Sequence, residues 1–174
     1  MITASPVVLA CGADEAFAMP MAVTLFSAIS HLTRPAEIYV IDGGLGGRTR
    51  DRLQEVLGQA RGDTRVTFLN PPLDVLRRGT LPLGGHSPMT YLRLLLPAVL
   101  PLEVTHVLYL DSDLLVRSDL GQLWDQKQMV DAIAGAPDYA SPVVSGRDGL
   151  PNWRELGLRS RTPWQQLPQV YQQH

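Results

Sequence analysis

The sequence Pro-Val-Val-Leu-Ala-Cys-Gly at residues 6–12 indicates the fold class. A short, continuous apolar run that ends at a glycine is typical of a strand buried on both faces, as in a parallel sheet. Similar runs follow at residues 37–41, 65–69 and 105–110. Two shorter apolar segments, residues 114–116 and 131–136, are the candidates for a fifth and a sixth strand.

Between these runs the sequence has the spacing of helices. Apolar residues recur at i, i+3, i+4 and i+7 in residues 25–32 and again in 53–60, which marks one face of a helix. Ser87 and Pro88 are typical of the start of a third helix, which we expect to span residues 89–96. Strands that alternate with helices predict an α/β fold with a mostly parallel, Rossmann-like sheet flanked by helices.

Length and composition limit the class of protein. The chain has 174 residues, enough for about one domain, and it is 45% apolar and 18% charged, which excludes a disordered chain. A net charge of −2 argues against nucleic acid as a partner. The single cysteine, the lack of a basic leader and the lack of a transmembrane segment predict a cytoplasmic protein. We expect one domain over residues 1–163 and a weakly ordered, glutamine-rich tail over 164–174.

The tripeptide Asp111-Ser112-Asp113 follows a predicted strand, and ligands of parallel sheets bind beyond the carboxyl ends of the strands. Two carboxylates two residues apart point the same way if the chain stays extended. Each raises the proton affinity of the other, so burial of both is unfavourable without a cation. Carboxylate oxygens suit Mg²⁺ or Mn²⁺, whose remaining positions take phosphate oxygens. A simple turn is the alternative, because Asp and Ser also favour turns at strand ends.

Two other segments carry candidate ligand contacts. Arg93 has a planar fork that suits phosphate oxygens, although it could also be a solvated residue on a helix surface. Gly12 would let a ligand approach the backbone, Asp14 could accept hydrogen bonds from a nucleotide base, and Phe17 could stack on that base. The alternatives are that Asp14 and Glu15 are simply an acidic helix start and that Phe17 belongs to the core. Residues 42–44, Asp-Gly-Gly, are most simply a turn.

Four stretches of the sequence together resemble glycosyltransferase family 8. They are ACGADEAFA at residues 10–18, VIDGGL at 40–45, TYLRL at 90–94 and VLYLDSDLLV at 107–116. They occur in the family's order, and the resemblance covers about residues 6–163. The last stretch, with its D-x-D motif, is the most specific. The family includes retaining galactosyl- and glucosyltransferases of lipopolysaccharide biosynthesis.

The resemblance implies a GT-A-like domain that binds a UDP-sugar donor with Mn²⁺ (or Mg²⁺). By this resemblance Asp111 and Asp113 would be metal ligands, and Asp111 and Ser112 would contact the nucleotide. Arg93, near the diphosphate, and Asp138, facing the sugars, would be the catalytic residues. The uridine pocket would be lined by Gly12, Ala13, Asp14 and Phe17.

The implied reaction transfers a hexose from the UDP-sugar to a saccharide or lipopolysaccharide acceptor with retained configuration. The resemblance ends near residue 163, before the segment in which family members supply a histidine as third metal ligand. We therefore expect an incomplete, C-terminally truncated donor half without robust transfer activity. One alternative is a non-catalytic UDP-sugar-binding fragment. Another is a metal-dependent nucleotidyltransferase, although the chain lacks that class's glycine-rich activating loop.

Overall fold

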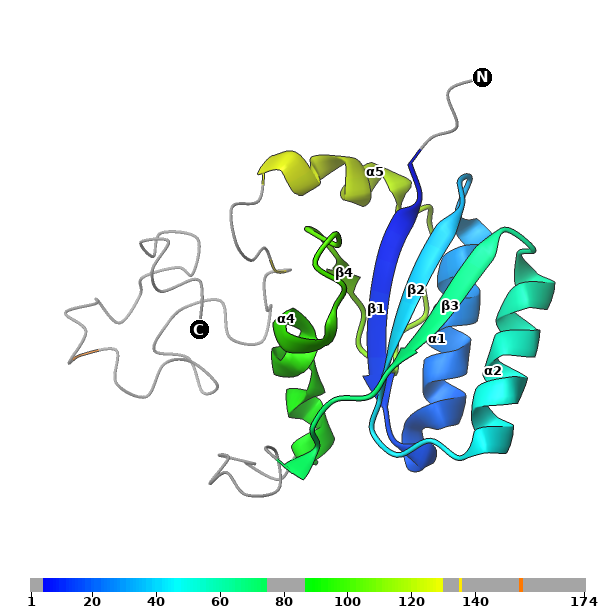
Figure 1. The fold of residues 1–174 in the computed structure, drawn as a ribbon. Coiled ribbons are helices and arrows are strands. Elements are labelled where there is room, and N and C mark those ends of the chain that lie inside the picture. Colours follow the sequence, from blue (N-terminus) through cyan, green and yellow to red (C-terminus); the bar gives the residue numbers. More distant parts are fainter. Residues whose placement is uncertain (1–4, 75–86, 130–134, 136–153, 155–174) are drawn as a thin grey trace. The chain divides into compact units, whose positions relative to one another are not determined.

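The computed structural model describes residues 5–74, 87–129, 135 and 154. Residues 1–125 form one compact unit, and its described part is a parallel sheet with helices on both faces (Figure 1). The second unit, residues 126–174, contributes η3 (Gln126–Met129) to the description. The strands of the first unit are β1 (Val7–Ala13), β2 (Ala36–Asp42), β3 (Thr64–Leu69) and β4 (Leu108–Tyr109). Its α-helices are α1 (Ala18–His31), α2 (Gly47–Ala60), α4 (Leu96–Val99) and α5 (Gly121–Asp125), and its 3-10 helices are η1 (Glu15–Phe17) and η2 (Pro88–Leu95).

The order of the strands in the sheet is β3-β2-β1-β4, and every pair is parallel. The chain steps from β1 to β2 and on to β3 in one direction, and β4 then returns to the other side of β1. Leu9 pairs with Ile38 on one side and with Leu108 on the other. The direction of winding therefore reverses between β1 and β4. This arrangement confirms the predicted α/β class with a parallel sheet flanked by helices.

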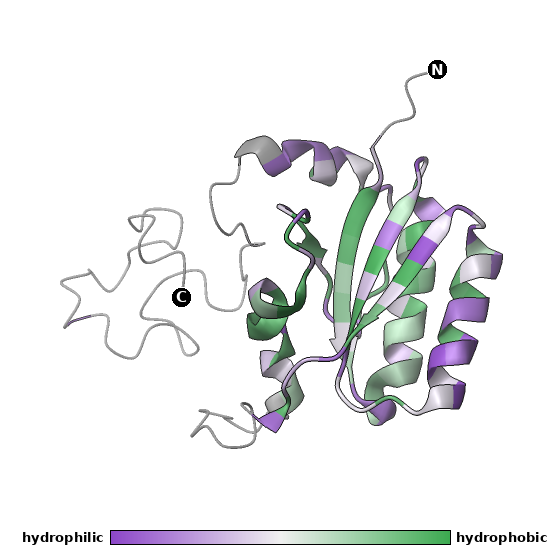
Figure 2. Ribbon diagram, viewed as in Figure 1, coloured by the Kyte–Doolittle hydropathy of each residue, from purple (hydrophilic) through white to green (hydrophobic). Residues whose placement is uncertain are grey.

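Two apolar clusters hold the helices to the two faces of this sheet. On one face, Leu9 of β1 packs in a cluster with residues of α1 and α2, including Leu25 and Leu57. On the other face, Ala10 packs in a cluster with Leu92 of η2. Full burial of a leucine side chain contributes about 1.5–3 kcal/mol. Alternate residues of β1 thus face opposite sides of the sheet, which explains its uninterrupted apolar sequence, visible as the green to pale green of β1 in Figure 2.

The predicted fifth strand is wrong. Residues 114–116 lie along α1 instead of joining the sheet. The Thr24 hydroxyl donates to the Leu114 carbonyl and accepts from the Leu114 N–H, both at 2.9 Å. The Ser27 hydroxyl accepts from the Val116 N–H at 3.0 Å. Side chains of a helix therefore satisfy backbone groups that a neighbouring strand would otherwise bind.

Several predicted boundaries also differ from the structure. Strand β1 continues through Gly12 to Ala13, and the strand expected over residues 105–110 is reduced to Leu108–Tyr109. The third helix is a 3-10 helix, η2, that leads directly into α4. Pro97 lies in the first turn of α4, where a missing N–H is tolerated, so the helical segment continues through Pro97 where the sequence predicted an end. The predictions for residues 131–136 and for the 164–174 tail fall outside the described residues, apart from the single residue 135.

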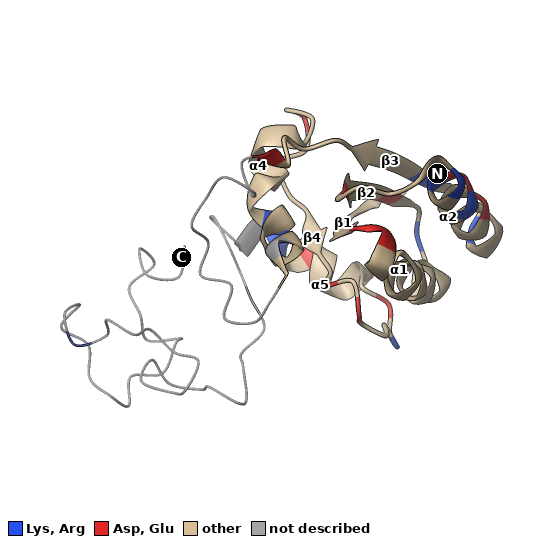
Figure 3. Ribbon diagram, turned by 90° about the horizontal axis from the view of Figure 1, so that it is seen from below, with Lys and Arg blue, Asp and Glu red and all other residues tan. Residues whose placement is uncertain are grey.

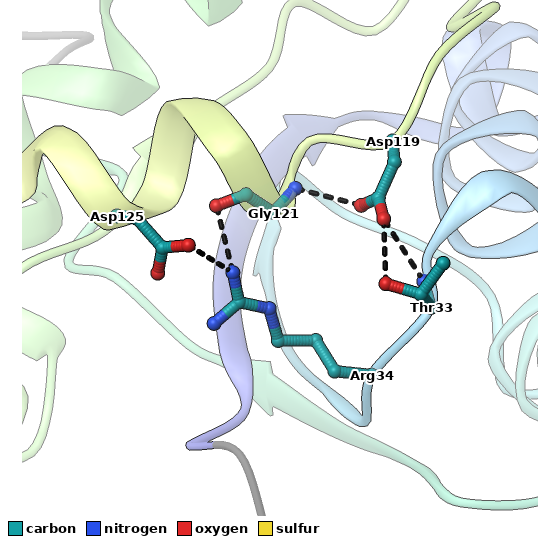
Figure 4. A network of polar contacts seen from close by, with 5 residues as sticks. All are labelled: Thr33, Arg34, Asp119, Gly121 and Asp125. Atoms are coloured by element: carbon teal, nitrogen blue, oxygen red, sulfur yellow. Dashed lines mark hydrogen bonds and ion pairs between the residues drawn. The ribbon is translucent and has the colours of Figure 1, made fainter.

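A polar network fastens α5 to the segment that precedes β2 (Figure 4). Arg34 donates to the Gly121 carbonyl at 2.8 Å and pairs with Asp125 at 2.6 Å. The Asp119 carboxylate accepts from the Thr33 hydroxyl and from the Gly121 N–H, each at 2.7 Å. Because this segment precedes β2, the network lies at the amino end of that strand, away from the strand ends discussed next.

Candidate functional site

The described candidate residues lie at or just after the carboxyl ends of β1 and β4, except for Arg93, which reaches Asp111 from η2. The winding of the sheet reverses between these two strands. The Leu110 N–H donates to the Ala10 carbonyl at 2.8 Å, and Asp111 is the next residue of the chain. Figure 3 looks onto these strand ends and shows acidic residues where β1 runs into α1. In open α/β sheets, ligands bind outside the carboxyl ends of the strands at such a reversal point. The topology thus brings two segments about a hundred residues apart in sequence to one edge of the sheet.

Arg93 makes three contacts that hold its guanidinium in place. Its Nη2 donates to Asp111 Oδ1 at 2.5 Å, and the side chains are 40% and 48% exposed. Its guanidinium lies 4.8 Å from the centroid of the Tyr109 ring, a cation–π distance. Its Nε also donates to the carbonyl of Thr90 in the same helix, at 3.0 Å. Arg93 is therefore a positioned residue at the site and not merely a solvated one.

Tyr109 is a site residue that the sequence analysis missed. Burial raises the pKa of its phenol to about 12, so the side chain is neutral at physiological pH. A neutral, largely buried ring is a suitable platform for a cation that must remain partly in solvent. Its signal in the sequence is its position two residues before Asp111, because alternate residues of an extended chain point to the same face.

The two carboxylates of the D-x-D motif differ in their surroundings. Asp111 is paired with Arg93, whereas Asp113 is exposed and makes no hydrogen bond or ion pair within the described part of the chain. Neither carboxylate is buried, so solvent and Arg93 relieve their mutual repulsion. Their oxygens have the chemistry that Mn²⁺ and Mg²⁺ prefer. Among the described residues, no group of three or more His, Cys, Asp or Glu is placed to hold a metal ion.

The segment after β1 is held by short-range contacts. Asp14 Oδ1 accepts from the Phe17 N–H at 3.2 Å and so caps η1. Phe17 is 48% exposed, which contradicts its alternative assignment to the core and leaves its ring open for stacking. Gly12 and Ala13 are buried, and a Cβ at Gly12 would lie 3.2 Å from the Ile41 Cβ, so packing restricts this position.

Glu15 is the second residue whose contacts the sequence did not reveal. Its Oε2 accepts from the Gly46 N–H at 2.7 Å, and its Oε1 accepts from the Thr49 hydroxyl at 2.6 Å. These bonds, the one from Gly46 first, lower the pKa of the Glu15 carboxyl. Beside it, the Gly43 N–H donates to the Ala13 carbonyl at 2.9 Å. The loops that follow β1 and β2 are therefore joined at two places.

Other candidates can be assigned to structural roles. The Asp42 carboxylate accepts from the N–H groups of Gly44 and Leu45 and pairs with Arg50 at 2.7 Å, which confirms a turn at residues 42–44. Burial raises the pKa of the Cys11 thiol to about 12, so it is not a nucleophile at neutral pH. Ser112 is partly buried beside the two aspartates. Asp138 lies outside the described residues.

Comparison with known proteins identifies the class. The family model for Glycosyl transferase family 8 matches residues 8–166, which include the strand ends described above. The chain therefore belongs to glycosyltransferase family 8, whose members act on a sugar donor and an acceptor and are generally metal-dependent. Among the described residues, no helix is long and apolar enough to cross a bilayer.

Individual relatives agree with the family and match only part of their own length. The chain is 40% identical over 74 residues to the probable galacturonosyltransferase-like protein 3 of Arabidopsis thaliana, which is 42% of this chain and 21% of that protein. A crystal structure of the galactosyltransferase LgtC with donor and acceptor sugar analogues is 25% identical, with a TM-score of 0.61 over 88% of this chain and 53% of that one. The bifunctional glycosyltransferase WbbM, at 23% identity and a TM-score of 0.56 over 72% of this chain and 22% of that one, shares the fold. The chain thus spans about a fifth of the curated relative and about half of the LgtC chain.

Proposed function

We propose that this chain binds the UDP-hexose donor of a retaining hexosyltransferase and that a divalent metal, Mn²⁺ or Mg²⁺, joins the diphosphate to the protein. The observation that supports the proposal most directly is the exposed carboxylate of Asp113, which has no hydrogen-bond or ion-pair partner among the described residues. It follows the Arg93–Asp111 pair, where the winding of the sheet reverses between β1 and β4. A pair of carboxylates alone would repel a diphosphate. A cation must therefore stand between them.

Residues at the carboxyl ends of β1 and β4 would each bind a different part of the donor. Asp111 and Asp113 would hold the metal, which, when bound, would neutralise the charge that develops on the departing UDP. The Arg93 fork matches phosphate oxygens and would contact the diphosphate. The ring of Phe17 would stack on uracil. Asp14, already a cap through one oxygen, keeps lone pairs for the base, and Gly12, Ala13 and Ser112 would line the uridine and ribose positions.

The acceptor we assign is a saccharide, with lipopolysaccharide as one candidate, and Asp138 is the residue we assign to the sugars. Membership in a glycosyltransferase family supports sugar transfer over nucleotidyl transfer. The printed names of two similar proteins, a galactosyltransferase and a galacturonosyltransferase-like protein, support a six-carbon sugar on the donor.

Calorimetric titration tests the proposal with the 174-residue chain. UDP is titrated into the protein with Mn²⁺ and again with EDTA, and ADP with Mn²⁺ serves as the matched nucleotide control. We expect removal of the metal to weaken UDP binding by at least about tenfold. Equal affinity for UDP in the two buffers would exclude the metal role. Equal affinity for ADP and UDP would exclude the assigned uridine pocket, and no binding of UDP at all would contradict the proposed function.

A further inference from the structure

We propose that Glu15 is a positioning residue for the donor nucleoside: it holds η1, with Asp14 and Phe17, against the amino end of α2. The inference rests on the proposed function, because it assigns the nucleoside to Asp14 and Phe17. Glu15 itself does not contact the donor in this proposal. Its role follows from what its two carboxylate oxygens bind and from what lies beside it in the chain.

The Glu15 carboxylate performs the task of a helix cap from a distant part of the chain. Gly46 is the N-cap residue of α2 and has no side chain with which to cap the helix. Glu15 lies 31 residues earlier in the sequence and accepts from the Gly46 N–H at 2.7 Å. Its other oxygen accepts from Thr49, in the first turn of α2, at 2.6 Å. A negative charge at a helix N-terminus is favourable, so the contact ties η1 to α2 by charge as well as by geometry.

A backbone contact fixes the residue on the other side of Asp14. The Ala13 carbonyl accepts from the Gly43 N–H at 2.9 Å. The approach is so close that a Cβ at Gly43 would lie 2.8 Å from that carbonyl oxygen, a distance that side chains do not tolerate. Asp14 is therefore flanked in sequence by two residues, Ala13 and Glu15, that are both bound to the loop after β2.

These contacts constrain Asp14 and Phe17 without using either side chain. The η1 helix is only three residues long, Glu15–Phe17, and its internal tie from Asp14 to Phe17 is a single side-chain bond of 3.2 Å, beside one backbone bond of the same length. A helix this short has little stability of its own. At its other end η1 runs directly into α1, and the Ala18 N–H donates to the Glu15 carbonyl. Without the Glu15 side-chain contact, the Ala13–Gly43 bond and α1 would still anchor η1, but nothing would tie it to α2, and the Phe17 ring, which is 48% exposed, would be held less firmly.

Three variants separate this role from a general loss of structure. Glu15→Ala removes both contacts. Glu15→Gln keeps a side chain of the same shape, whose oxygen can accept from Gly46 and whose amide can donate to Thr49, and serves as the conservative rescue. Glu55→Ala is the matched control: Glu55 is also exposed and also accepts one side-chain hydrogen bond, from Gln59, but it lies on the body of α2.

The measurements compare UDP with inorganic pyrophosphate, both in the presence of Mn²⁺. We expect Glu15→Ala to weaken UDP binding by about threefold to tenfold, the factor that follows if the competent loop arrangement falls to about 10–30% of molecules. Pyrophosphate binding should not change, because in the proposed function the diphosphate is bound at Arg93 and at the loop after β4, which contains Asp111 and Asp113. Glu15→Gln should restore most of the UDP affinity, and Glu55→Ala should bind both ligands like the wild type. Equal losses for UDP and pyrophosphate, or unchanged UDP binding in Glu15→Ala, would overturn the inference.

Amide hydrogen exchange at Phe17 provides a readout that needs no ligand. Exchange should be faster in Glu15→Ala than in the wild type and in Glu15→Gln, because the N–H bonded to Asp14 opens when η1 is released. Unchanged exchange would overturn the inference whatever the binding data show. If exchange is faster in Glu15→Ala but the wild type binds no UDP, Glu15 does hold η1 in place, and the proposed function is refuted instead.

Discussion

The loops after β1 and β4 each carry a closely spaced pair of acidic residues, and the two pairs have opposite surroundings. After β1, Asp14 accepts a backbone N–H and Glu15 accepts a backbone N–H and a hydroxyl. After β4, Asp111 meets a guanidinium, and Asp113 has no partner among the described residues. Acidic residues at strand ends are therefore of two kinds. Those bound to the backbone maintain the local structure, and those without such a partner are available for a cation.

This difference has opposite consequences for stability. A carboxylate that accepts backbone hydrogen bonds stabilises the folded state while it is ionised. Two carboxylates with only one cation between them repel each other, and neutralising one removes that repulsion. Substitutions in the first loop should therefore reduce stability and affect ligand binding only through loop position. Substitutions in the second should affect ligand binding directly and leave stability unchanged or slightly higher.

The largest effect is expected at Asp113. Asp113→Asn should weaken Mn²⁺-dependent UDP binding by at least about tenfold, because it removes a charged metal ligand. The free energy of unfolding should change by less than about 0.5 kcal/mol, as for other exposed sites. Calorimetry and denaturant unfolding measure the two quantities, and Asp51→Asn, an exposed residue of α2, is the control. A variant that loses stability and keeps its UDP affinity would favour a turn at residues 111–113 over a metal site.

Much of the fold could be predicted from the sequence because its signals are local. The apolar runs of β1, β2 and β3 and the helical spacing in α1 and α2 each lie within a few residues. The segment 114–116 was mispredicted because its apolar composition matches a strand, whereas its hydrogen-bond partners, Thr24 and Ser27, lie about 90 residues away. Composition cannot reveal partners at that distance.

The candidate site was predicted as a set of residues but not as a set of contacts. Asp111, Asp113 and Arg93 could be selected from residue chemistry, position after a strand and family resemblance. The pairing of Arg93 with Asp111 could not, because it depends on how η2 packs against the sheet. The same holds for Glu15, whose partners belong to another helix. Such contacts depend on tertiary packing, so they are seen in the structure and cannot be predicted from the sequence.

A smaller effect is expected at Tyr109, the last residue of β4, whose ring lies beneath Arg93 beside the second loop. Tyr109→Leu removes the ring beneath Arg93 and should weaken UDP binding by roughly twofold to fivefold, since an exposed cation–π contact contributes about 0.5–1 kcal/mol. Tyr109→Phe keeps the ring and should bind UDP like the wild type. Titrations of both variants, at equal and verified folded fractions, measure the difference. Equal losses in the two variants would assign the effect to the hydroxyl and not to the ring.

The smallest effect is expected at Asp119. It tests whether an acidic residue that accepts a backbone hydrogen bond stabilises the fold elsewhere in the molecule too. The Asp119 carboxylate accepts hydrogen bonds from the Thr33 hydroxyl and from the Gly121 N–H (Figure 4). These bonds, with the larger effect from Thr33, hold the pKa of Asp119 below its ordinary value of 3.8. A carboxyl whose pKa is lower in the folded state stabilises the fold at pH values above its unfolded pKa. This stabilisation is lost as the pH falls through the folded pKa.

Asp119→Asn keeps the shape of the side chain but not its charge. The free energy of unfolding of this variant should therefore be about 0.3–1 kcal/mol lower than that of the wild type at neutral pH. Denaturant unfolding at neutral pH and below pH 3.8 should show the gap between wild type and variant narrowing at the lower pH, while UDP binding stays unchanged. A gap of the same size at both pH values would mean that the charge of Asp119 contributes nothing, and the distinction between the two kinds of acid would then rest on geometry alone.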